Sequence, residues 1–86
     1  MTTVAAIKER LATLQPTRLD VIDDSAQHAG HAGARDGGGH YRVHIVSERF
    51  AGLPTMARHR LVYDALGTLM EGAIHALSIT ARTPAE

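Results

Sequence analysis

The sequence contains no cysteine, and this absence excludes two kinds of chemistry. Without thiols the chain can form no disulfide, which suits a reducing compartment such as the cytoplasm. It also lacks the thiolates that usually bind zinc or iron–sulfur clusters. Imidazole is therefore the only soft metal ligand that the chain offers, and it has six histidines.

Aromatic residues and excess charge are also scarce. The chain has one phenylalanine, two tyrosines and no tryptophan, whereas proteins that bind single-stranded nucleic acid usually stack several aromatic rings on the bases. Nine basic and nine acidic side chains cancel, so long-range attraction to polyanions or membrane surfaces is weak. The composition argues against a dedicated nucleic-acid or membrane-surface protein and leaves room only for a local basic patch.

Long hydrophobic runs are absent as well. No apolar stretch approaches the roughly 18 residues that a transmembrane helix requires, and the first residues lack the basic start and apolar run of a signal peptide. A chain of 86 residues has room for one hydrophobic core. We therefore expect a single soluble, cytoplasmic domain over residues 1–86.

Two segments have the hydrophobic spacing of amphipathic helices. The first covers residues 4–14 and is expected to end before Pro16. The second is expected to begin with Pro54, which suits the first position of a helix. It contains Gly67, and Gly72 is expected to end it in a left-handed conformation.

Three segments are predicted to be strands: 18–25, 40–47 and 74–82. Residues 27–39, which are rich in glycine and histidine, are expected to be a flexible loop between the first two strands, which would pair antiparallel. The third strand follows a long helical crossover and can lie parallel to one of the others. The predicted fold is α+β, with a three-stranded mixed sheet and its helices on one face.

His75 is the first candidate ligand. It alternates with Leu77 and Ile79, which predicts that it shares their face at the rim of the core. Two interpretations stay open, because the ring could bond a backbone carbonyl or could be a metal ligand held on a rigid strand end.

The other histidines are less distinctive. His28 and His31 are three residues apart, so they could bind one metal, but ordering a glycine-rich loop is costly; alternatively both are solvated. His40 and His44 are expected on the open face of the second strand as surface residues. No group resembles a closed zinc site, which usually combines four ligands at recognisable spacing.

Enzymatic machinery is not recognisable. Ser25 and Ser47 lack the G-x-S-x-G context of a hydrolase, and the neighbouring carboxylates Asp23 and Asp24 lie at a strand end. The glycine run 37–39 precedes a predicted strand and not a helix, so it cannot cradle a phosphate. We expect that the chain has no catalytic residue and is not an enzyme.

Several ordered motifs resemble those of the BolA family over nearly the whole chain. They are residues 21–25 (VIDDS) leading to His28 and His31, 39–43 (GHYRV), 45–52 (IVSERFAG), 58–63 (RHRLVY), 74–79 (IHALSI) and 82–86 (RTPAE). The resemblance implies an αββααβ fold similar to the class II KH domain.

The resemblance also implies a partner and a cofactor. Proteins of this family form heterodimers with monothiol glutaredoxins that bridge a 2Fe–2S cluster, and the histidine of the last strand, here His75, is the recurrent ligand. A second ligand comes from the loop between the first two strands, which makes His31 or His28 the candidate here. Glutaredoxin and glutathione would supply the thiolates, since histidines can replace two of the four cysteines.

Under this interpretation the chain is a non-enzymatic adaptor in iron–sulfur cluster assembly and delivery or in iron sensing, and is a colourless monomer when alone. Arg58, His59, Arg60 and Tyr63 are expected to contact the partner. The resemblance does not say whether the cluster is transferred, stored or sensed.

The alternative interpretation is a DNA-binding transcriptional regulator, because some BolA proteins are described as such. Arg49, Arg58 and Arg60 would then contact phosphates. Residues 50–55 (FAGLPT) occupy the place of the G-x-x-G loop of KH domains, but with one glycine and a proline. Close backbone approach to phosphates is therefore impaired.

Overall fold

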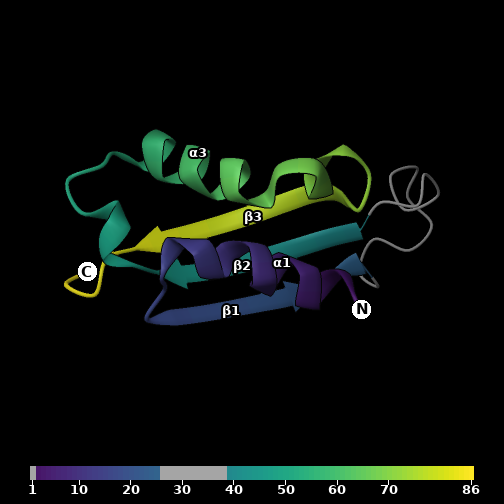
Figure 1. The fold of residues 1–86 in the computed structure, drawn as a ribbon, viewed down its shortest axis with the longest axis horizontal. Helices are drawn as coiled ribbons and strands as arrows, with labels where there is room; N and C mark the ends of the chain where they lie inside the picture. The colour runs from purple at the N-terminus through teal and green to yellow at the C-terminus, as the bar shows by residue number, and fades with distance from the viewer. Residues whose placement is uncertain (1, 26–38) are drawn as a thin grey trace.

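The computed structural model describes residues 2–25 and 39–86. Two α-helices and three strands make up most of this part of the chain (Figure 1). In chain order the elements are α1 (Thr3–Leu11), η1 (Ala12–Leu14), β1 (Arg18–Asp23), β2 (Gly39–Val46), η3 (Glu48–Phe50), α3 (Thr55–Leu66), η4 (Gly67–Glu71) and β3 (Ile74–Arg82), where η marks a short 3-10 helix.

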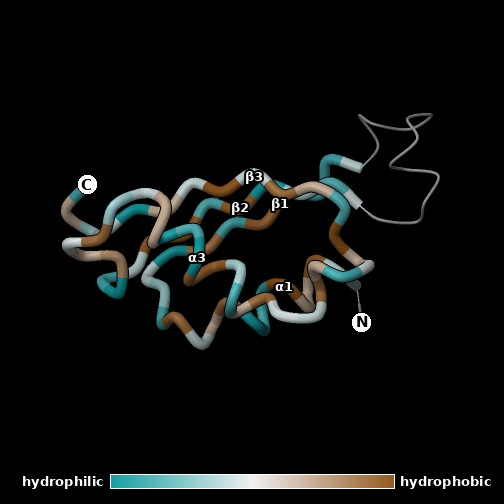
Figure 2. Tube along the Cα trace, turned by 90° about the horizontal axis from the view of Figure 1, so that it is seen from above, coloured by the Kyte–Doolittle hydropathy of each residue, from teal (hydrophilic) through white to brown (hydrophobic). Residues whose placement is uncertain are grey.

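The sheet has the predicted mixed topology. Its strand order is β1-β2-β3, with β2 antiparallel to β1 and parallel to β3. Both α-helices lie on one side of the sheet (Figure 2). The predicted αββααβ order is met with the first crossover helix reduced to the 3-10 turn η3.

The core lies between the helices and the central strand. The inward residues of β2 alternate with residues that face away from the helices, as one-sided burial requires. Burying one large apolar side chain contributes about 1.5–3 kcal/mol. The residues at the centre of this core are Ile7, Leu11, Tyr41, Val43, Ile45, Phe50, Val62 and Leu66.

The helix starts agree with the sequence pattern to within one residue. The Thr2 hydroxyl caps α1 by accepting from the Ala5 amide at 3.1 Å. Pro54 was predicted to be the first residue of the second helix, but it is the preceding cap, with an extended backbone (φ −70°, ψ 164°), and α3 begins at Thr55.

The predicted end of the second helix is wrong. Helix α3 stops at Leu66, and Gly67 has a positive φ of 53°, whereas Gly72 is extended with a φ of −168°. Leu69 and Met70 prolonged the apolar stripe in the sequence because they also pack on the core, but they do so from the 3-10 turn η4. Because the hydrophobic spacing continues past the end of α3, the sequence pattern did not show where the α-helix ends.

Three further expectations concern the end of β1, the loop that follows it and membrane-spanning helices. Strand β1 ends at Asp23, two residues earlier than predicted. The predicted loop 27–39 lies outside the described residues except for Gly39, which is the first residue of β2. Within the described part of the chain, no helix is long and apolar enough to cross a membrane.

A candidate site of paired histidines at the sheet end

His75 lies at an irregularity in the sheet. Gly39 is paired with Ile74 and His40 with Ala76, so His75 is an extra residue in β3. The regular alternation fails here, because the consecutive residues His75 and Ala76 are both exposed, whereas Ile74 is buried. The prediction that His75 shares the face of the inward residues of β3 is wrong, because strict alternation assumes an unbroken register.

The extra residue brings two imidazoles together. The ring centroids of His40 and His75 are 5.3 Å apart, and the ring planes are tilted by 41°. Sequence reasoning assigned His40 to the surface and missed this contact. The sequence nonetheless indicated it, because both histidines lie within the first two residues of predicted strands, and parallel neighbours begin at the same end of a sheet.

The backbone at Gly39 and His40 is held by residues next to both neighbouring strands. The carbonyl of His40 accepts from the Asp24 amide at 2.7 Å, and the amide of His40 donates to the Ser25 hydroxyl at 3.1 Å. The preceding amide, of Gly39, donates to the Ala73 carbonyl at 3.1 Å. These bonds fix the point where the imidazole leaves the sheet.

Two carboxylates support this end of β1. Asp23 accepts from the Ser25 amide at 2.8 Å, and hydrogen bonds from the side chain and then the backbone of Ser25 lower the pKa of Asp23. Asp24 forms an ion pair with Arg42, with Oδ2 and Nε 2.6 Å apart. The positive charge of Arg42, two residues beyond His40 on the same face, is thus largely compensated.

Gly39 allows the chain to pass beneath an aromatic ring. A Cβ atom at this position would lie 2.5–2.7 Å from ring atoms and the hydroxyl of Tyr41. Since Tyr41 is buried, its ring has little room to withdraw. The absence of a side chain at Gly39 is therefore part of the local packing that precedes His40.

The donor set is incomplete for a closed metal site. Among residues 2–25 and 39–86, no group of three or more His, Cys, Asp or Glu side chains is placed to hold a metal ion. At this end of the sheet the described residues bring two imidazoles together, so a metal or cluster bound there would need its remaining ligands from elsewhere. The predicted ligands His28 and His31 lie outside the described residues and stay a prediction.

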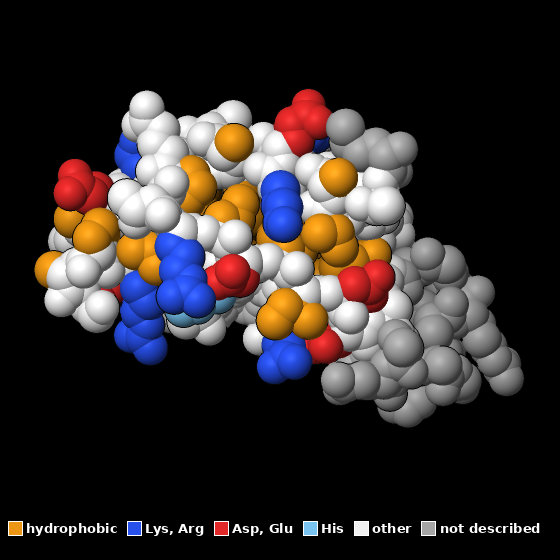
Figure 3. All heavy atoms as spheres, turned by 90° about the horizontal axis from the view of Figure 1, so that it is seen from below, with side chains coloured by type: hydrophobic (Ala, Val, Ile, Leu, Met, Phe, Trp, Pro, Cys, Tyr) orange, Lys and Arg blue, Asp and Glu red, His pale blue; other side chains and the backbone are white. Residues whose placement is uncertain are grey.

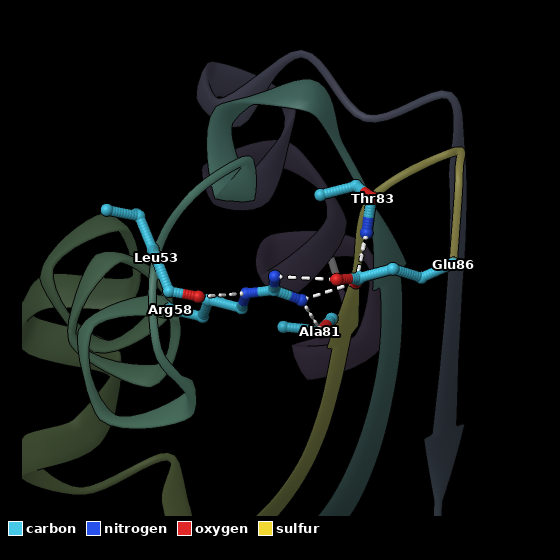
Figure 4. A network of polar contacts seen from close by, with 5 residues as sticks. All are labelled: Leu53, Arg58, Ala81, Thr83 and Glu86. Carbon is cyan, nitrogen blue, oxygen red and sulfur yellow. Dashed lines mark hydrogen bonds and ion pairs between the residues drawn. The ribbon is translucent and has the colours of Figure 1, made fainter.

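Arg58 has a structural environment that the sequence did not reveal (Figure 4). Its guanidinium donates to the carbonyls of Leu53 and Ala81 at 2.8 and 3.1 Å and forms a two-point ion pair with Glu86. Glu86 also accepts from the Thr83 amide at 2.9 Å. The bonds from Arg58 and then Thr83 lower the pKa of Glu86 to about 2.

The other residues predicted to meet a partner lie on the outer face of α3. His59, Arg60 and Tyr63 line a shallow hollow together with Met56, whose exposed fraction of 76% is unusual for a large apolar side chain. This hollow is separate from Arg58, which is mostly covered, with 13% of its side chain exposed.

The residues predicted to contact DNA do not share one environment. Arg49 donates to the Gln15 side chain at 3.0 Å, Arg58 is paired with Glu86, and Arg60 is exposed. On the face that Figure 3 shows, basic and acidic side chains are interspersed. Their role as phosphate contacts stays a prediction.

Comparison with known proteins finds similar sequences that match most of this chain. A family model described as BolA-like protein matches residues 11–86. SufE-like protein 1, chloroplastic/mitochondrial, of Arabidopsis thaliana is 48% identical over 93% of this chain, and BolA-like protein 1 of Mus musculus is 43% identical over 95% of it. The chain spans 23% of the first relative and 58% of the second.

Solved structures share the fold over nearly the whole chain. BolA1 from Arabidopsis thaliana has a TM-score of 0.84 and 37% identity, covering 100% of this chain and 96% of that one. The BolA domain of SufE1 from the same organism has a TM-score of 0.85 and 42% identity, covering 99% and 95%. The similarity therefore includes sequence as well as architecture.

Proposed function

The chain belongs to the BolA-like family, and on this premise we propose that it pairs with a monothiol glutaredoxin to bind a 2Fe–2S cluster between the two proteins. In this role it is a non-enzymatic adaptor in iron–sulfur cluster assembly and delivery or in iron sensing. The observation that carries the proposal is the exposed imidazole of His75, held at a strand end beside a second imidazole.

The ligand chemistry explains why a partner is required. A 2Fe–2S cluster takes four protein or small-molecule ligands, and histidines can replace two of the usual cysteines. This chain has no cysteine, so a glutaredoxin cysteine and the thiol of glutathione would supply the two thiolates. His75 is the proposed third ligand, and His31 or His28 the fourth.

The position of His75 suits a shared ligand. A residue on a hydrogen-bonded strand needs little ordering before it binds, whereas a loop residue must be immobilised at an entropic cost. The exposure of His75 leaves its ring accessible to a partner protein. One similar protein, SufE-like protein 1, carries its match within a longer chain, so this fold also occurs there as one part of a larger protein.

The test is co-reconstitution. The chain is mixed with a monothiol glutaredoxin, glutathione, iron and sulfide, and the product is separated by size and measured by visible absorbance and circular dichroism. We expect a coloured heterodimer whose spectrum differs from that of the glutaredoxin homodimer. A mixture that yields only the homodimer's cluster contradicts the proposal.

Histidine variants identify the ligands in the same assay. His75→Ala should shorten the lifetime of the cluster more than His31→Ala, because His28 can partly replace His31, and changing His28 and His31 together should exceed either single loop change. His44→Ala is the matched control, since His44 lies further along the same strand as His40. An unchanged spectrum and lifetime in His75→Ala would remove the main site assignment.

A further inference from the structure

We propose that His40 and His75 together bind one divalent transition-metal ion, with Zn²⁺ as the reference case, when the protein is alone. The proposal does not rest on the glutaredoxin partnership, because it requires only the two imidazoles of the described structure. It assigns a ligand role to His40, and it leaves the remaining coordination positions to water or to a small thiol or carboxylate.

The ring spacing is the main argument. A nitrogen bound to zinc at about 2.0–2.1 Å places its imidazole centroid about 3.2 Å from the metal, so two rings at the tetrahedral angle have centroids about 5.2 Å apart. The observed separation between His40 and His75 is 5.3 Å. The separation of the two rings therefore matches that of two imidazoles bound to one tetrahedral ion.

The backbone supports the same geometry. Hydrogen bonds from the end of β1 hold the main chain of His40, and His75 lies at the register shift that turns it out of the regular alternation. Two ligands on adjacent hydrogen-bonded strands lose less conformational entropy on binding than two ligands on a loop. The pair is thus arranged before the ion arrives.

Charge at the site is compatible with a cation. Arg42 follows His40 on the same face of β2, and Asp24 neutralises it through a 2.6 Å ion pair that also includes a second, longer contact. Asp24 belongs to the same strand end that holds the His40 backbone. The arrangement limits the repulsion that an unpaired guanidinium would exert on a divalent ion.

The test is a titration of the isolated full chain with Zn²⁺ by isothermal calorimetry, repeated with Co²⁺ and its visible spectrum. We expect one ion per chain. His40→Ala and His75→Ala should each weaken binding by at least about tenfold, because each removes half of the protein ligands. His44→Ala is the matched control and should bind as the unchanged protein does.

A second measurement covers the case in which a His40 variant folds poorly. In the unchanged protein, Zn²⁺ should shift the ring-nitrogen resonances of His40 and His75 in a two-dimensional NMR spectrum and leave those of His44 and His59 in place. Binding that persists in both alanine variants and disappears only when His28 and His31 are replaced would overturn the assignment. So would the absence of any shift at His40. No glutaredoxin is present, so either failure leaves the cluster proposal untouched.

Discussion

Gly67 shows how one residue sets the direction of the chain after α3. Its φ of 53° lies in the region that residues with a Cβ atom avoid, and its ψ of −125° makes the position still less accessible to them. A Cβ atom would also lie 3.2 Å from the Arg10 guanidinium, which donates to the Leu66 carbonyl at 3.4 Å. The helix can therefore end here only because the residue is glycine.

Replacing Gly67 with alanine should lower the free energy of unfolding by about 1–3 kcal/mol, the usual cost of a strained backbone position. Urea denaturation measures the loss. Gly72→Ala is the matched control, since Gly72 is extended and a Cβ atom there would meet nothing within 4 Å. Equal effects of the two changes would contradict the assignment of the helix end to Gly67.

At the scale of elements, Ser47 joins the end of β2 to the turn after α1. Its fully buried hydroxyl donates to the Leu14 carbonyl at 2.7 Å and accepts from the Arg49 amide at 3.1 Å. Ser47→Ala should cost about 1–3 kcal/mol, because it leaves a buried carbonyl unsatisfied. The control is Ser78→Ala on the exposed face of β3. Denaturant midpoints that shift equally in both variants would contradict this role.

The ion pair between Arg58 and Glu86 fastens the end of the chain to α3. The folded pKa of Glu86, about 2, lies below the ordinary value of 4.5. Its contribution to stability is therefore fully present above pH 4.5 and is lost as the pH falls toward 2. Glu86→Gln should lower the melting temperature at pH 7 and have little effect near pH 2.

Arg60→Gln is the control for this pH profile, because Arg60 is exposed on the same helix. We expect it to leave both the melting temperature and its pH dependence close to those of the unchanged protein, as for most exposed substitutions. If Glu86→Gln changes the melting temperature by the same amount at pH 7 and at pH 2, the carboxylate charge is not what stabilises the contact between Glu86 and α3.

The elements were predictable where burial imposes a period. One-sided burial of β2 produces the alternation of Tyr41, Val43 and Ile45, and this pattern identified the strand. The shift at His75 was not predictable, because it depends on how two strands distant in sequence align. The same holds for the pairing of Arg58 with Glu86, 28 residues away, which no local pattern indicates.

At the scale of the whole molecule, the balance of charge bears on the DNA-binding alternative. The net charge is zero, and both signs are interspersed on the face in Figure 3. We expect duplex DNA to bind weakly, equally for different sequences, and less as salt rises. Fluorescence anisotropy at several salt concentrations measures this. Tight, sequence-selective binding that Arg60→Glu abolishes would favour the regulator instead.

The central claim is that an imidazole of this chain binds the cluster shared with glutaredoxin. The most direct measurement is pulsed electron paramagnetic resonance on the reduced heterodimer, with only this chain's histidines labelled with ¹⁵N. We predict a hyperfine coupling from a directly bound ¹⁵N nucleus that weakens or disappears in His75→Ala and persists in His44→Ala. A reduced cluster without any ¹⁵N coupling, or one whose coupling is unchanged by His75→Ala, would contradict the claim.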